Sequence, residues 1–442
     1  MALSALVVLL TVGVGALVGM MLAKPSPAEN AAGTGNSDTI AVTEAELKKA
    51  VLEHGNAYQT GDLKGYLKIF DQKNAALVKA QTRTFANLRK LPLQSASFEI
   101  LKQQGLAQDN FGRQVSFSLD VAFVHQFAGI DLRPVAEWYR WTVTKASKDA
   151  PLVVTKVGGA PAAFGEDKTV FYPAPWDSWP DISVTKTLHT IVLAPPAQAA
   201  RARQIAPVAE RAAAEDLDFW AKNGDGSAEV PAGFVVALAK GRAQLGHLFR
   251  TVEKVTESGV SIGMPTFGGS GDKVKIGGSR IVVDTASPFF DDAKGVREIF
   301  RHEMAHSVMA PLDNGEFEVL GGDNWIIEGF AEFMAHRGES LNANGRTPQT
   351  RAYVRGQLDQ PFTGKIPDNL SWDAEGLTSV NYQLGHLAIQ LIAERYGEER
   401  MTAFVAAYYR DKKADTALQD VLGVSRQEFE RQWAQYVRGK LG

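Results

Sequence analysis

The sequence predicts an α+β protein built from two folded domains. Its 442 residues, 45% of them hydrophobic and 22% charged, are typical of a globular chain that is too long for one domain. Apolar residues recur first at helical spacing, then with a period of two after about residue 95, and again at helical spacing near the C-terminus. We therefore expect an accessory α+β domain at residues 41–170 and a larger domain at residues 171–442.

The N-terminus has the composition of a membrane anchor or a signal sequence. Residues 2–23 contain no charge, and as a helix they would span about 33 Å, enough to cross a bilayer core. A basic region before the apolar run, typical of cleaved signals, is missing, which favours a retained anchor over a cleaved signal. Residues 24–40 are rich in Pro, Ala, Gly, Ser and Asn, as in a flexible linker. We expect a membrane-anchored protein whose folded part is exported, or a secreted one.

The accessory domain begins with helices. A pattern from Thr43 to Thr60 opens with a possible capping box of Thr43 and Glu46 and stops at Gly61, and a second helix is expected at residues 63–70. Alternating apolar and polar residues then predict strands at residues 97–101, 115–125 and 135–144.

This order of elements resembles the cone of nuclear transport factor 2 and its bacterial relatives, in pattern and not in motif. Such cones serve as ligand pockets, dimerisation modules or spacers. We expect His125, in an apolar strand, to be a structural histidine whose polar atoms are satisfied.

Residues 171–180, FYPAPWDSWP, are a candidate domain junction, because prolines forbid regular structure while aromatic residues need burial. Packing at an interface is the simplest interpretation, and stacking of a sugar or another ligand is the alternative. Beyond the junction we expect a strand at residues 182–193, a helix at 196–222, and strands at 234–238 and 279–284.

The C-terminal part ends in helices. Residues 339–376 hold several Gly, Pro, Asn and Asp residues and predict a long irregular segment near the cleft, with a lid as one possibility. Helices are then expected at residues 378–396, 398–410 and 425–440.

The motif His302-Glu303-Met304-Ala305-His306 carries the chemistry of the sequence. On a helix, His302 and His306 lie one turn apart on one face, so two imidazoles can bind one metal ion. Glu303 is placed to take a proton from a water that the metal activates. A catalytic zinc site needs a third protein ligand, for which Glu328 in the downstream stretch WIIEGFAE is the best candidate. Glu332, at i+4, could accept the free ring N–H of a ligand histidine.

Both motifs have helical contexts. Asp291 and Asp292 are possible caps of the first helix, which should stop before Pro311, and the second should begin near Asp323 or Asn324. The chain contains no cysteine, so the metal ligands must be nitrogen and oxygen, and disulfides, a cysteine nucleophile and a lipoprotein anchor are excluded.

Together, H-E-x-x-H and W-x-x-E-G-x-A-E resemble the gluzincins, the thermolysin and aminopeptidase clan, and within them the peptidase-MA-like proteins. The likeness covers roughly residues 175–442 and is specific over 302–332. It implies a zinc metallopeptidase domain with a mixed sheet, zinc-site helices and a C-terminal helical subdomain. It also implies one Zn²⁺ ion and a peptide or protein substrate. The implied ligands are His302, His306 and Glu328, with Glu303 as general base.

The sequence departs from the family in two places. Glu332 occupies the position where the family commonly has an aspartate, and 21 residues separate His306 from Glu328, which we interpret as a longer loop over residues 311–322. The aminopeptidase strand G-x-M-E-N is not present, which favours endopeptidase action.

Gluzincins supply a Tyr or His to the tetrahedral intermediate from a helix beyond the third ligand. Tyr382 and His386, one turn apart, fall at a similar distance, and either could donate a hydrogen bond to the oxyanion. In the alternative, Tyr382 packs in the helical core and His386 caps or salt-links the helix.

The formal net charge of −3, without a block of Lys or Arg, argues against nucleic acid as a partner. We therefore predict peptide-bond hydrolysis at the cell envelope. The alternative is a catalytically inactive envelope binding or scaffold protein that retains the fold.

Overall fold

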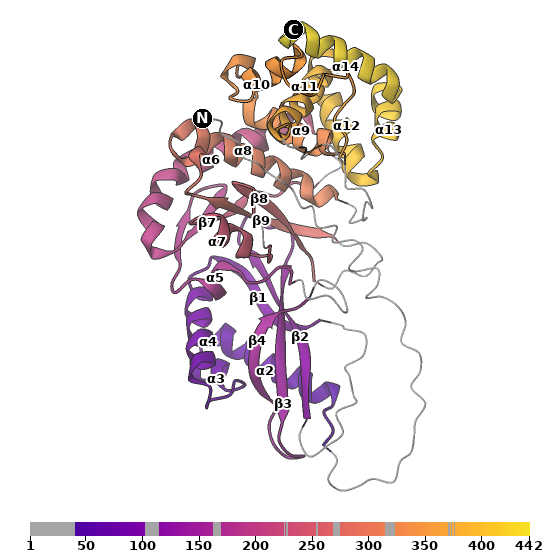
Figure 1. Cartoon of the computed structure of the whole chain (residues 1–442). Helices are drawn as coiled ribbons and strands as arrows, with labels where there is room; N and C mark the ends of the chain where they lie inside the picture. The colour runs from indigo at the N-terminus through magenta and orange to yellow at the C-terminus, as the bar shows by residue number, and fades with distance from the viewer. Residues whose placement is uncertain are drawn as a thin grey trace, which may run out of the picture.

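The computed structural model describes residues 40–101, 115–161, 169–224, 226, 229–252, 255–267, 275–313, 323–369, 372, 374 and 376–442. Figure 1 shows the N-terminal helices and the first sheet at the bottom, a second sheet in the middle and the C-terminal helices at the top. The predicted membrane segment at residues 1–23 lies outside the described residues. Within the described ranges, no helix has the length and apolar character needed to cross a membrane.

Three helices open the chain: α2 (Glu44–Thr60), α3 (Leu63–Leu67) and α4 (Ala75–Leu88). The predicted cap is present, because the Thr43 hydroxyl accepts a hydrogen bond from Glu46 N at 3.2 Å. The second helix is shorter than predicted, since Val154 N donates to Ile69 O at 2.8 Å and draws the chain into a bridge with the first sheet. Helix α4 was not predicted.

The first sheet is antiparallel, in the order β1-β2-β3-β4. Its strands are β1 (Leu93–Ile100), β2 (Val115–Phe127), β3 (Val135–Lys145) and β4 (Val153–Gly159). The three predicted strands are confirmed, and β4 is added to them. His125 is a satisfied structural histidine, as expected: its Nδ1 lies 3.2 Å from Phe123 O and its Nε2 lies 3.2 Å from Arg280 Nη2.

The second sheet is mixed, in the order β5-β6-β7-β9-β8. Its strands are β5 (Ser183–Lys186), β6 (Thr190–Ala194), β7 (Phe234–Ala239), β8 (Gly259–Pro265) and β9 (Ile276–Asp284). The single strand predicted at residues 182–193 was wrong. A turn splits it into β5 and β6. Glu210, which is not part of this hairpin, accepts a hydrogen bond from His189 N at 2.9 Å and so holds the turn in place.

Both faces of the second sheet are buried. Alternate residues of β6 face different cores: Val192 and Ala194 pack with α6 (Ala199–Asn223) and the C-terminal helices, whereas Ile191 and Leu193 pack with the first sheet. The accessory part of the chain therefore shares a core with the sheet of the second part.

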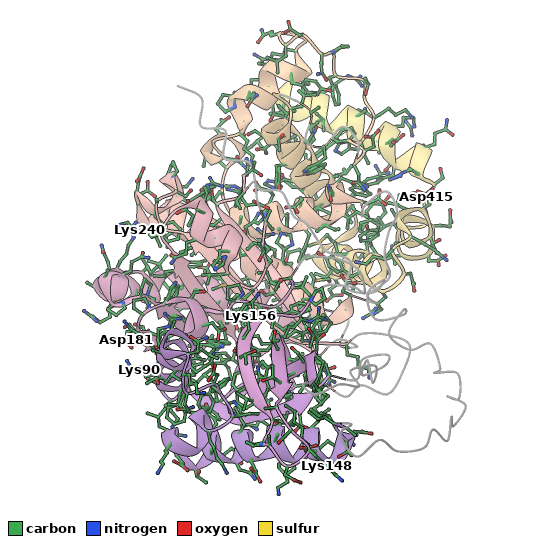
Figure 2. All side chains as sticks on the ribbon, turned by 60° about the horizontal axis from the view of Figure 1, so that its bottom comes forward. Lys90, Lys148, Lys156, Asp181, Lys240 and Asp415 are labelled. Atoms are coloured by element: carbon green, nitrogen blue, oxygen red, sulfur yellow. The ribbon has the colours of Figure 1, made fainter. Side chains whose placement is uncertain are left out.

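The junction at residues 171–180 is not wholly irregular, because it contains the short helix α5 (Pro175–Ser178), which begins at a proline. Its aromatic residues Trp176 and Trp179 are buried, as interface packing requires. Figure 2 shows Lys90 and Asp181 next to each other at this junction, where they form an ion pair.

Of the remaining helices, α7 lies beside the second sheet in the middle of Figure 1, and the others build its upper part. The α-helices are α7 (Arg242–His247), α8 (Ala293–Met309), α9 (Asn324–His336), α10 (Thr347–Val354), α11 (Thr378–Tyr396), α12 (Glu398–Asp411), α13 (Ala414–Ala417) and α14 (Arg426–Leu441). Short 3₁₀ turns lie at Pro196–Gln198, Pro288–Phe290, Ala310–Leu312 and Leu341–Ala343, and a π-helical turn lies at Leu418–Leu422. The segment 339–376, predicted as irregular, thus contains α10.

Candidate metal centre

Helices α8 and α9 bring three potential metal ligands together. Asp292 caps α8 by accepting a hydrogen bond from Gly295 N at 2.8 Å, and the helix then places His302 and His306 on one face. Their Nε2 atoms are 3.2 Å apart. Oε2 of Glu328, from α9, lies 3.2 Å from His302 Nε2 and 3.6 Å from His306 Nε2.

These distances fit a tetrahedral zinc ion. Bonds of about 2.0–2.1 Å from zinc to nitrogen and oxygen give ligand atoms about 3.3 Å apart in a tetrahedron. Glu328 is buried, and among the described residues its near polar neighbours are the ring nitrogens of His302 and His306. A buried carboxylate needs a charged or hydrogen-bonding partner, and a cation between the three side chains would supply one. Three protein ligands of N and O type also match the donor set of catalytic zinc sites.

Glu303 faces the first residue of β8. A Cβ atom on Gly259 would lie 2.6 Å from Glu303 Oε1, so another residue there would displace the Glu303 side chain. Glu303 is 0% exposed, and neither of its carboxylate oxygens has a hydrogen-bond partner. Burial raises its pKa to about 8, although the positive charge of His302 opposes the shift. The structure therefore holds beside the ligands a carboxylate that is free to accept a proton.

Glu332 lies behind His302, with Oε1 3.3 Å from His302 Nδ1. Its carboxylate is held by Arg346, whose Nη2 and Nε donate to Oε1 and Oε2 at 3.0 and 3.2 Å. An imidazole whose Nδ1–H is directed at a carboxylate presents its Nε2 lone pair to a metal. Glu332 thus has the contact that the sequence predicted for it.

Arg346 is a candidate site residue that the sequence did not reveal. It precedes α10, inside the segment predicted to be irregular, and its guanidinium lies 4.9 Å from the ring centre of Tyr382. No spacing relates it to Glu332. Only the chemistry of a buried carboxylate, which needs a cation, could have indicated that such a residue exists.

Tyr382 reaches the ligand set and His386 has other neighbours. The Tyr382 ring lies 6.1 Å from the His302 ring, and Gly385 on the same helix packs directly on Gly329 of α9, where a Cβ would be 2.6 Å from Gly385 O. The His386 ring stacks on His336 at 6.0 Å, and burial lowers its pKa to about 3. The structure therefore brings Tyr382, and not His386, to the predicted ligands.

A cavity of about 320 Å³ adjoins the Nδ1 side of His302. Its walls include Ile299 and Phe289 together with the cations Lys294 and Arg346 and the carboxylate of Glu332, so it combines apolar surface with charges of both signs. A cavity of this volume has room for a side chain of a bound peptide.

Glu298, His336 and Glu339 form a second group that could hold a metal within the described part of the chain. Lys294 Nζ already lies 2.6 Å from Glu298 Oε1 and 3.5 Å from Glu339 Oε2. Because a protein cation neutralises these carboxylates, we assign no metal to this group.

No protein-family model matches the chain, and no curated protein matches it. Among solved structures, an M1 zinc metallopeptidase from Deinococcus radiodurans is similar, with 14% identity and a TM-score of 0.30. The alignment covers 79% of this chain and 62% of that one, so the chain spans less than two thirds of the solved protein. A likeness of this size carries no assignment of family or activity.

Proposed function

We propose that the protein is a zinc-dependent metallopeptidase of the gluzincin type. One observation carries the proposal: His302, His306 and Glu328 present three ligand atoms at tetrahedral spacing beside the buried, unpartnered carboxylate of Glu303. A structural zinc site has no need of a free carboxylate next to its ligands, whereas hydrolysis by a water needs one.

Each side chain has a defined task in this proposal. A zinc ion held by the three ligands would supply Lewis-acid chemistry toward a water and a peptide carbonyl. Glu303 accepts a proton from the attacking water and delivers it to the leaving amine. Glu332 accepts the Nδ1–H of His302, and Arg346 keeps that carboxylate in place. Tyr382 donates a hydrogen bond to the developing oxyanion.

The second sheet offers an edge for an extended peptide. Strand β9 lies between β7 and β8 and is interior. Strand β8 is the end strand, and its first residue, Gly259, touches Glu303. Its outer backbone groups would bind a substrate strand alongside the general base, which supports an internal peptide bond as the target.

The domain organisation and the location belong to the same proposal. The antiparallel first sheet, with α2, α3 and α4, supports a cone-like accessory domain at residues 41–170 followed by the metallopeptidase domain. The uncharged run at residues 2–23 supports anchoring in a membrane or export.

Elemental analysis of the full chain, followed by digestion of a peptide library, tests the proposal. We expect one zinc per chain and cleavage that a chelator abolishes and added zinc restores. A protein that binds one zinc and cleaves no peptide would instead be the inactive binding or scaffold protein.

A further inference from the structure

Arg250 is a buried arginine with uncommitted hydrogen-bond donors. It is 6% exposed, and its Nε and Nη1 atoms have no hydrogen-bond partner. Those two atoms carry three of the five N–H groups of a guanidinium. Its single ion pair among the described residues is from Nη2 to Glu257 Oε1, at the long distance of 3.4 Å.

Arg280 shows how this protein otherwise treats a buried arginine. Both of its Nη atoms bind the Asp131 carboxylate, at 2.7 and 3.0 Å, and Nη2 also contacts His125. Only Nε of Arg280 lacks a hydrogen-bond partner, and open donors on a buried guanidinium are costly. The open donors of Arg250 therefore indicate an anionic group that binds there.

Arg250 lies on the Glu303 side of the metal centre. Its partner Glu257 stands two residues before Gly259, the first residue of β8 and the residue that touches Glu303. Glu257 is itself satisfied, because its Oε2 accepts a hydrogen bond from Thr256 N at 3.0 Å. The Arg250 guanidinium, with Nε and Nη1 open, and the Glu303 carboxylate thus flank the same end of the edge strand.

The backbone around Arg250 is held in a strained conformation. Arg250 forms a β-bridge with Val170. Phe249 and Phe171, the neighbours of these two residues, have φ angles of 59° and 55°, in the left-handed region that is unfavourable for side chains other than glycine. Strain of this kind persists where the surrounding structure enforces it, and it is frequent at binding sites.

We infer that Arg250 binds a carboxylate of the substrate on the Glu303 side of the scissile bond. The inference rests on the proposed peptidase function and deepens it, by assigning a preference for peptides that carry an acidic group. A planar guanidinium with open N–H groups matches a carboxylate, and the contact with Glu257 engages only Nη2. The carboxylate belongs either to an Asp or Glu side chain or to the C-terminus of a peptide.

Matched peptides test the inference on the full chain. In one series a glutamate replaces an isosteric glutamine at each position around the cut, and in the other a C-terminal acid replaces a C-terminal amide. A charged hydrogen bond predicts a kcat/KM about tenfold to a hundredfold higher for the acidic member at one position. A response in the glutamate series would identify the carboxylate as a side chain, and a response in the C-terminal series would identify it as the C-terminus of the peptide. Equal rates in every pair would overturn the inference while the peptidase function stands.

Variants of Arg250 locate the preference. Arg250→Gln should bring the ratio of acidic to amide peptide near one while cleavage of the amide peptide changes little, and Arg250→Lys should keep part of the ratio. Arg242→Gln is the control, because Arg242 lies nearby but is engaged by Ser258 and Asp284, so its loss should leave the ratio unchanged. An equal loss on both peptides would indicate a contact with a backbone carbonyl and overturn the inference. If Arg250→Gln does not fold, the inference is tested by comparing the ratio of acidic to amide peptide cleavage in the parent with the ratio in Arg250→Lys.

A measurement of peptide binding tests the Arg250 inference separately from the peptidase function on which it rests. If the parent cleaves no peptide, the peptidase proposal fails, and calorimetry of the same peptides with the full chain carrying Glu303→Gln still tests Arg250. Tenfold tighter binding of an acidic peptide would support the inference, and equal binding would overturn it.

Discussion

Arg346 holds Glu332 by two hydrogen bonds, at 3.0 and 3.2 Å, and so fixes the carboxylate that faces Nδ1 of His302. The pair is buried, with 13% of the Arg346 side chain and 4% of the Glu332 side chain exposed. A long segment that leaves the end of α9 thus returns to the metal centre and orients a ligand from behind.

Arg346→Lys should weaken zinc binding by about tenfold to a hundredfold, because lysine cannot hold both carboxylate oxygens and the ligand histidine loses its fixed orientation. Competition with a chromophoric chelator measures the change. Arg337→Lys is the matched control, since Arg337 makes the same two-bond contact with Glu398 at the exposed surface. Equal zinc affinity in Arg346→Lys and the parent would rule out the positioning role.

Tyr382→Phe should lower kcat by roughly 10²- to 10³-fold with little change in KM, as expected when one oxyanion donor is removed. Steady-state kinetics and a thermal melt of the same sample measure the effect. A tyrosine that only packs in the core would behave differently. It would lose about 1 kcal/mol of stability and keep its turnover per folded molecule.

His386→Ala is the companion variant. Because His386 stacks on His336 and meets Phe333 edge to face, we expect a lower melting temperature and an unchanged kcat. A large fall in kcat with normal melting would return His386 to the catalytic set.

The free energy of unfolding should fall as the pH rises above about 4, the ordinary pKa of an unfolded carboxyl group. Burial raises the pKa of both Glu137 and Asp177, which share the Tyr139 hydroxyl at 3.1 and 2.9 Å. A carboxyl group whose pKa is raised by folding stabilises the protein fully below its unfolded pKa, and this stabilisation is lost as the pH rises through the raised value.

Asp177→Asn should make the free energy of unfolding fall less steeply with pH. The asparagine amide carries its hydrogens at every pH, whereas the two carboxyl groups have a hydrogen to share only while one of them is protonated. Urea unfolding at pH 5 and pH 8 measures the difference, at about 1.4 kcal/mol for each unit of pKa removed. Asp181→Asn is the control, since the ion pair with Lys90 lowers the pKa of Asp181 and its loss cannot remove the decline. If the free energy of unfolding of Asp177→Asn and of the parent fell equally with pH, a proton shared between Glu137 and Asp177 would be contradicted.

The metal-ligand candidates could be predicted because their signal is local. His302 and His306 are one helical turn apart, and Glu328 follows within one loop, so the spacing itself carries the geometry. Arg346 and Arg250 could not be found in this way. Their roles come from contacts with residues on other elements, and those contacts leave no period in the sequence.

The elements that the sequence did not predict were missed for similar reasons. Helix α4 buries Gln81, Thr84 and Asn87 along its inner face, so its pattern is not apolar. Strand β8, which reads GVSIGMP, contains two glycines and a proline, residues that usually mark loops. Its first glycine leaves room for the Glu303 side chain, and that contact is visible only once the helix is in place.

Zinc should be present at one ion per chain and lost in His302→Ala and Glu328→Ala, because two ligands hold a catalytic ion poorly. Elemental analysis after gel filtration measures it. His247→Ala, which removes an exposed histidine, should retain the full amount. Unchanged zinc in both ligand variants would place the metal elsewhere.

The most direct test of the account is peptide hydrolysis and zinc content measured on one preparation of Glu303→Gln. The substitution keeps the size of the side chain and removes its basic carboxylate, so zinc should stay at one per chain. Hydrolysis should fall by roughly 10²- to 10⁴-fold. Activity within about tenfold of the parent, with zinc retained, would contradict Glu303 as the base and with it the proposed mechanism.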